Sequence, residues 1–167
     1  MNLLIEITAM RNLYIATNEF SALNRSRLHA LDYNKWVKYI ESNSSYFIWY
    51  SDTESGRRLA ESITNMPIEK RQTYLHLLSK YRCEAGYDSK KGYNLIDVTF
   101  HKELRYISIY FERNPKIEEL RRFLDMAKHL NASLLIDGKK VIDEKFIDVL
   151  EKQQNDKKEK SPEAEIL

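Results

Sequence analysis

The sequence contains little cysteine and little glycine, and each scarcity excludes a class of protein. Cys83 is the single cysteine among 167 residues, so no internal disulfide can form, and we expect a reducing location, the cytoplasm. Only four glycines are present, and no glycine-rich turn of the kind that cradles phosphates or dinucleotides occurs. The sequence therefore lacks a Walker loop and a dinucleotide-binding motif.

Long hydrophobic runs and an excess of one charge are also missing. No stretch approaches the roughly 18 apolar residues that a membrane helix needs, and the segment Met1–Glu6 lacks the basic start of a signal peptide. The 27 basic residues face 25 acidic ones, which gives a net charge of +2. This balance gives no strong attraction to DNA, RNA or an anionic membrane, and we expect no membrane association.

The length and hydrophobic content fit one folded domain. A chain of 167 residues with 43% hydrophobic residues can build an ordinary core without metals or disulfides. No internal repeat and no linker divides the chain. We predict one domain over residues 1–152, followed by a flexible, charged tail over residues 153–167.

The first half of the chain alternates between strand and helix signals. Weak alternation predicts strands over Leu3–Met10 and Leu13–Ala16, and helical spacing predicts a helix from Tyr33 with Asp32 as its N-cap. The segment Tyr46–Tyr50 is apolar on both faces, which is typical of an interior strand covered on both sides.

Two helices are predicted after this strand. Ser51 and Glu54 have the spacing of a capping box, which favours capping over a catalytic or metal-binding role for Asp52 and Glu54. Gly56 lies inside the first helix, and we expect close backbone packing on a neighbouring strand there. The second helix begins at Pro67, and its predicted inward residues are Ile68, Leu75 and Leu78.

The clearest strand signal is a hairpin between Tyr93 and Glu112. Apolar residues alternate with polar ones on both strands, and a short turn fixes their register. This register sets His101 opposite Tyr106 and Thr99 opposite Ser108.

The last third of the chain carries strong boundary signals. Asn114 and Pro115 predict the start of a helix, and Asp137-Gly138 is typical of a type I′ turn between two short strands. Asp143 is a plausible N-cap of a final helix. Because hairpins and helices mix without strict alternation, we predict an α+β fold, in which helices pack on a mostly antiparallel sheet.

The polar face of the predicted hairpin is the most suggestive group of side chains. An acid, an imidazole, two hydroxyls and two phenols share this face: Asp97, Thr99, His101, Tyr106, Ser108 and Tyr110. Three interpretations remain open: a solvated face, a partner-binding surface, and a catalytic site with His101 as acid or base. Asp97 and His101 stand about 7 Å apart along the strand, which is too far for direct hydrogen bonding unless both side chains lean together.

Other chemical signals are weak. The four histidines are scattered and no cysteine pair exists, so we predict neither a metal site nor a cofactor. Cys83 follows Arg82, which would lower its pKa slightly, but lone cysteines usually fill small core spaces.

Basic pairs suggest a second kind of partner. Lys90 and Lys91 lie between Tyr87 and Tyr93, and lysines with aromatic residues can hold phosphates and stack bases. Arg57 and Arg58 form another pair, although acids one turn away favour a solvated helix face.

We therefore expect a non-catalytic protein-binding module, such as a regulator, inhibitor or immunity-type protein. Its predicted contact residues are Asp97, His101, Tyr106, Tyr110, Tyr87 and Tyr93. The alternative is a nucleic-acid-binding protein that uses Lys90, Lys91, Arg57 and Arg58. An enzyme of unfamiliar type with His101 as its acid or base is the third hypothesis.

Overall fold

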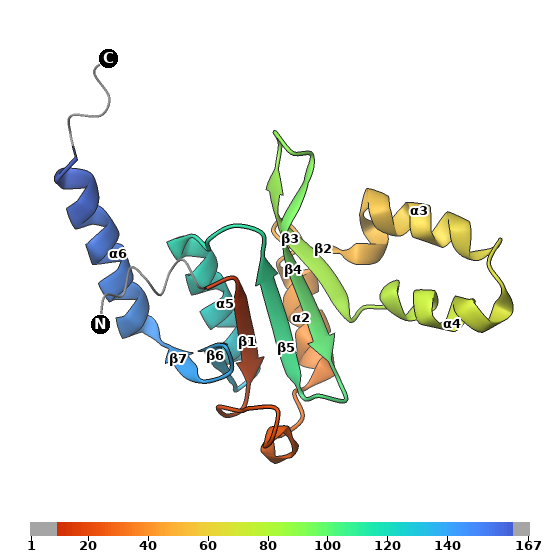
Figure 1. The fold of residues 1–167 in the computed structure, drawn as a ribbon, viewed down its shortest axis with the longest axis horizontal. Helices are drawn as coiled ribbons and strands as arrows, with labels where there is room; N and C mark the ends of the chain where they lie inside the picture. The colour runs from red at the N-terminus through yellow and green to blue at the C-terminus, as the bar shows by residue number, and fades with distance from the viewer. Residues whose placement is uncertain (1–9, 162–167) are drawn as a thin grey trace.

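The computed structural model describes residues 10–161, and its centre is a seven-stranded antiparallel sheet with the order β2-β3-β4-β5-β1-β6-β7 (Figure 1). The strands are β1 (Asn12–Ala16), β2 (Ile48–Trp49), β3 (Arg82–Asp88), β4 (Tyr93–His101), β5 (Tyr106–Phe111), β6 (Ser133–Ile136) and β7 (Lys140–Ile142). Five α-helices accompany them within the described residues: α2 (Tyr33–Ser42), α3 (Glu54–Ile63), α4 (Ile68–Leu77), α5 (Ile117–His129) and α6 (Glu144–Glu159). The predicted α+β class and its single compact domain are confirmed.

The main core lies between one face of the sheet and helices α2 and α5. Alternate apolar residues of the central strands, such as Ile96 and Ile109, pack against Trp36 of α2 and Phe123 of α5. In Figure 1 both helices lie behind the sheet, and no helix of residues 10–161 lies in front of β4, β5 or β1. Within this part of the chain, helices therefore cover only one face of the central sheet.

The hairpin register is as predicted. His101 pairs with Tyr106 and Thr99 with Ser108. The type I′ turn is confirmed as well, because Asp137 and Gly138 have φ angles of 52° and 74°. Asp32 and Asp143 cap α2 and α6, each accepting a hydrogen bond from the backbone amide three residues later.

Several boundary predictions were wrong. The strand predicted over 46–50 is only the two-residue edge strand β2, and its residues are half-buried rather than covered on both faces. The cap of α3 is Thr53 and not Ser51, which belongs to a short 3-10 helix over Tyr50–Asp52. Helix α5 begins at Ile117 with Lys116 at the cap position, later than Asn114.

Two of the three residues predicted to point inward from α4, Ile68 and Leu75, are a further correction, whereas Leu78 at the C-cap is half-buried. This helix has no buried residue, and Ile68 and Leu75 are 75% and 49% exposed. The two helices α3 and α4 project together from the β2–β3 edge of the sheet (Figure 1), and we call this pair the helical arm.

Two predictions concern the ends of the chain, a first strand over Leu3–Met10 and a flexible tail from residue 153. The strand predicted over Leu3–Met10 lies outside the described residues, apart from Met10, which is in a turn. The predicted tail begins at residue 153, but α6 continues to Glu159. The boundary at 152 therefore falls inside a helix, whose residues from 155 onward are solvent-exposed.

Candidate functional site

The uncovered side of the central sheet is the first candidate site, and we call it the open face. Strand register brings together side chains that are distant in sequence, because directly paired residues point to the same side of a sheet. The paired residues on this side come from β3, β4, β5 and β1: Arg82, Glu84, Asp97, Thr99, His101, Tyr106, Ser108, Tyr110, Asn12 and Tyr14.

An ion pair with two hydrogen bonds holds one part of the open face. The guanidinium of Arg82 donates from Nε and Nη2 to the two carboxylate oxygens of Asp97, at 3.2 and 2.6 Å. The same guanidinium lies over the ring of Tyr50, 4.2 Å from its centre. Arg82 is thus held between a carboxylate and a ring, and the carboxylate of Asp97 is already engaged.

His101 has a different partner. Its Nε2 and the Ser108 hydroxyl oxygen share a hydrogen bond of 2.8 Å. Burial lowers the pKa of His101, and the charge of Asp97 opposes this shift only in part. The structure therefore does not join Asp97 and His101 as an acid-base pair, since each side chain is bonded to another residue.

The two tyrosines of the hairpin face differ in their environment. Tyr110 is 47% exposed and lies between Asp97 and Asn12 in the strand register. Tyr106 is half-buried, and its ring stacks on that of Phe20 at 5.1 Å between centres. Tyr110 is consequently the more accessible aromatic residue on the open face.

The other predicted contact residues lie on the β3–β4 hairpin. Tyr87 and Tyr93 are 67% and 46% exposed. Tyr93 donates its hydroxyl hydrogen to Glu112 at 2.8 Å, and Lys91 forms an ion pair with the same carboxylate at 3.3 Å. The Asp88 carboxylate accepts from the backbone amides of Lys90 and Lys91. The end of this hairpin is thus exposed, and the carboxylates of Glu112 and Asp88 hold its side chains and backbone in place.

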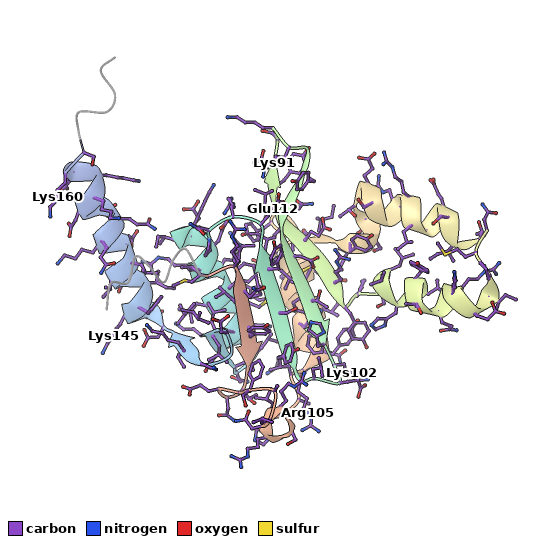
Figure 2. The ribbon with its side chains drawn as sticks, in the orientation of Figure 1. Lys91, Lys102, Arg105, Glu112, Lys145 and Lys160 are labelled. Carbon is purple, nitrogen blue, oxygen red and sulfur yellow. The ribbon has the colours of Figure 1, made fainter. Side chains whose placement is uncertain are left out.

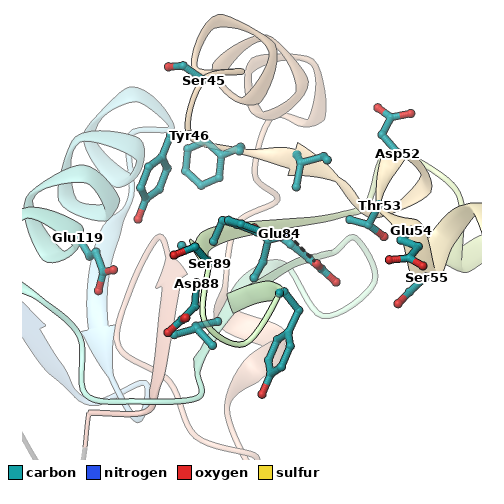
Figure 3. Close-up of a pocket in the computed structure, with 18 of the residues that line it drawn as sticks. Ser45, Tyr46, Asp52, Thr53, Glu54, Ser55, Glu84, Asp88, Ser89 and Glu119 are labelled. Atoms are coloured by element: carbon teal, nitrogen blue, oxygen red, sulfur yellow. Dashed lines mark hydrogen bonds between the residues drawn. The ribbon is translucent and has the colours of Figure 1, made fainter.

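A broad cleft of about 1100 Å³ lies beside this hairpin. Figure 3 shows Tyr46 and Glu119 on one side of it and Thr53, Glu54 and Ser55 on the other. Lys90 and Arg58 line the cleft, whereas Lys91 and Arg57 do not. Arg58 is also paired with Glu54. The structure thus brings together only one member of each predicted basic pair.

Acids line the same cleft in number. They come from every wall: Asp52, Glu54, Glu84, Asp88, Glu118 and Glu119. A groove for nucleic acid needs an excess of positive charge along its length. The mixed charge of this cleft does not favour the predicted nucleic-acid surface.

A buried ion pair closes the α5 side of the cleft. The carboxylate of Glu119 is 6% exposed and accepts two hydrogen bonds from Arg113, at 2.6 and 2.9 Å, and one from the Lys116 amide. The nearby Tyr46 hydroxyl has no hydrogen-bond partner among residues 10–161, and burial and the charge of Glu119 raise its pKa to about 12. This arrangement is structural in character, since all its charges are paired.

The geometry supports neither of the other two chemical hypotheses, a nucleophilic cysteine and a metal site. Cys83 is buried, and burial raises the pKa of its thiol well above the ordinary value, so the nucleophile hypothesis has no support. Within residues 10–161, no group of three histidine, cysteine or carboxylate side chains is arranged to hold a metal ion. None of the helices in this range is both long and apolar enough to span a membrane.

Sequence reasoning missed Arg82, Tyr50, Tyr14 and Phe20 as contributors to these surfaces. The strand β3 carried no signal beyond the alternation of the small residues Cys83 and Ala85, so the pairing of Arg82 with Asp97 was not visible.

The chain matches no protein-family model, and comparisons with curated proteins and with solved structures also find no match.

Proposed function

We propose that the protein is a non-catalytic binding module that docks another protein on the open face of its sheet. The observation that carries the proposal is that, within the described residues, helices cover one face of β4, β5 and β1, while the other face carries the exposed Tyr110 opposite Asp97, whose carboxylate holds Arg82. Tyrosine and arginine are enriched at protein interfaces because they combine a large contact area with hydrogen-bonding groups. A regulator, inhibitor or immunity-type role and a cytoplasmic location belong to the same proposal.

The pre-ordered side chains of this face support binding over catalysis. Asp97 holds Arg82, and Ser108 holds His101, so these groups lose little conformational freedom when a partner docks. A catalytic pair would instead need a base aimed at a reacting group, and the half-buried His101 shares its hydrogen bond with a neighbouring serine.

Site-specific photocrosslinking in the native cell tests the proposal. A photoreactive phenylalanine analogue replaces Tyr110 in one variant and Val149 in another; Val149 is 44% exposed on α6 and serves as the control. We expect a discrete protein adduct from position 110 and none from position 149. A third variant at Tyr87 separates the open face from the β3–β4 hairpin.

The second half of the test concerns affinity. Once the adduct identifies a partner, Tyr110→Ala should weaken its binding while the urea midpoint of unfolding stays the same, because the side chain is half exposed. Adducts only at position 87 would move the surface to the hairpin, and no adduct at either position would contradict the proposal.

A further inference from the structure

A second hollow lies at the end of the sheet where β1 ends and β5 begins, away from the cleft. The loop after β1 folds under this end (Figure 1) and is fastened at two points. Phe20 donates its backbone amide to the Gly138 carbonyl at 2.8 Å, and Arg105 donates from its guanidinium to the Leu28 carbonyl at 2.8 Å. Figure 2 places Arg105 and Lys102 at this end of the molecule.

The hollow has a volume of about 390 Å³, and we call it the end pocket. Its volume lies at the lower end of the range of small-ligand sites. Eight residues line it: Tyr14, Phe20, Ser21, Ala22, Arg25, Tyr106, Asp137 and Lys139.

Three aromatic rings form much of the lining. The rings of Phe20 and Tyr106 are nearly parallel, 5.1 Å apart between centres, and Tyr14 meets each of them edge-on at 5.4 and 5.3 Å. All three are half-buried, so each also presents part of its surface to the pocket. Such rings are platforms on which a flat heteroaromatic group stacks.

The β6–β7 turn is shaped to receive the Phe20 ring. A Cβ atom on Gly138 would lie 3.0 Å from the Phe20 carbonyl oxygen and 3.1 Å from two ring carbons. The glycine therefore serves both the type I′ turn and the close approach of the ring. The position of Phe20 is fixed by backbone packing and does not depend on a ligand.

The charged groups of the pocket are Arg25, Lys139 and Asp137, with a net charge of +1. Neither cation forms an ion pair or hydrogen bond with another described residue, in contrast to Arg82 and Arg113. Asp137 is exposed on the turn beside them. The pocket thus offers two unengaged cations and one carboxylate acceptor around an aromatic wall.

We propose that the end pocket binds a nucleotide, with its base against the rings and its phosphate at Arg25 and Lys139. Asp137 accepts a hydrogen bond from an exocyclic amino group of the base. An acidic peptide would use the two cations but would leave the rings unused and would face the Asp137 carboxylate. This recognition needs no glycine-rich loop, and it goes beyond the proposed protein-binding function. The nucleotide is either free or the terminal residue of a single-stranded RNA.

Calorimetric titration of the full chain tests this assignment. The probes are AMP, UMP, inorganic phosphate and a short 5′-phosphorylated oligoadenylate. We expect AMP to bind more tightly than UMP, which lacks an exocyclic amino group, and phosphate alone to bind at least tenfold more weakly than AMP, since stacking contributes about that factor or more per base. Binding of AMP points to a free nucleotide, and binding of the oligoadenylate alone points to an RNA end.

Matched variants locate the binding. Phe20→Leu removes the flat ring but keeps an apolar side chain, and Arg25→Gln combined with Lys139→Gln removes both cations. Each should weaken binding about tenfold or more. Lys157→Gln combined with Lys158→Gln makes the same charge change on an exposed part of α6 and should leave binding unchanged.

A further variant isolates the carboxylate. Asp137→Asn keeps the turn, because Asn-Gly also favours a type I′ turn, and should remove the preference for AMP over UMP. The proposal is overturned if no nucleotide binds, if phosphate binds as tightly as AMP, or if the Lys157 and Lys158 control loses as much binding as the pocket variants. If Phe20→Leu proves unstable, the charge variants and the probe series still decide the outcome.

Discussion

The carboxylate of Glu119 illustrates what a single buried charge requires. It is 6% exposed and receives three hydrogen bonds, two of them from Arg113. Removing water from a carboxylate is costly, and its partners offset that cost only while all of them are present. The Arg113 side chain is 31% exposed, so its guanidinium keeps part of its contact with water while Glu119 is buried.

Arg113→Met should therefore destabilise the protein by about 3 kcal/mol, at the lower end of the range for breaking a buried ion pair, because Arg113 is partly exposed. Urea unfolding measures the loss. The double variant with Glu119→Met should recover part of it, since no buried charge is then left unpaired. A single-variant loss below about 1 kcal/mol, as for surface pairs, would contradict the buried character of this pair.

His101 predicts a pH effect on stability. Burial holds its folded-state pKa below the unfolded value of about 6.5. The unfolded chain therefore binds more protons as the pH falls below about 6.5, and stability decreases until the folded-state pKa is reached. The stability that the neutral imidazole contributes is fully present above the unfolded-state pKa.

Urea unfolding between neutral pH and about pH 5 checks this sign. His101→Asn should reduce the loss of stability on acidification relative to the unchanged protein. The same substitution at the exposed His29 is the control. Equal acid sensitivity of the unchanged protein and the His101 variant would show that other groups carry the effect.

At the scale of elements, α3 depends on one close backbone contact. A Cβ atom on Gly56 would lie 1.9 Å from the Tyr50 carbonyl oxygen and 2.9 Å from the Ser51 Cα. The helix starts on top of the preceding 3-10 turn, and Thr53 connects the two by accepting from the Gly56 amide and donating to the Tyr50 carbonyl. The expected close backbone packing at Gly56 is confirmed, but the expected neighbour was wrong, because Gly56 packs against the 3-10 helix Tyr50–Asp52 and not against a strand.

Gly56→Ala should destabilise the protein by about 1–3 kcal/mol, the cost of overpacking, although alanine alone would favour a helix by about 1 kcal/mol. Urea unfolding gives the free energy, and hydrogen exchange over residues 50–63 locates the change. Ser55→Ala, at an exposed neighbouring position, is the control. A stabilised Gly56→Ala variant would show that the contact relaxes without cost.

In helix α4, the spacing of apolar residues predicted the helix correctly but did not predict the burial of its apolar side chains. Ile68→Ala and Leu75→Ala should each change the free energy of unfolding by no more than about 0.5 kcal/mol, because both side chains are exposed. Ile40→Ala, the same change at a residue that is 1% exposed on α2, should cost about 2–5 kcal/mol. Urea unfolding compares the three variants, and a large cost at Ile68 would mean that this face is buried in solution.

The elements that could be predicted from sequence are those with a local cause. Alternation and a short turn fix the β4–β5 register, and Asp137-Gly138 specifies its turn by its φ angles. Strand β3 lacks such a cause, since its buried residues Cys83 and Ala85 are small and alanine is depleted in strands. The Arg82–Asp97 pair depends on β3 and was missed with it. Residues 153–159 are polar, but most of them are glutamine, lysine or glutamate, which are good helix formers, so α6 continues through them.

At the scale of the whole molecule, burial is concentrated in the central strands and in α5, whereas α4 has no buried residue. Local opening needs less free energy where fewer apolar contacts must be broken. The helical arm should therefore open independently of the sheet, while β1, β4, β5 and α5 open only with global unfolding.

Hydrogen exchange followed by mass spectrometry tests this division of the molecule. Amides of α4 should exchange far faster than those of α5, which is of similar helical character but contributes several fully buried side chains, including Phe123 and Met126. Equal protection of the two helices at low protein concentration would contradict the prediction. Protection of α4 that appears only as the concentration rises would instead identify the helical arm as a surface on which two copies of the chain associate, because only intermolecular burial depends on concentration.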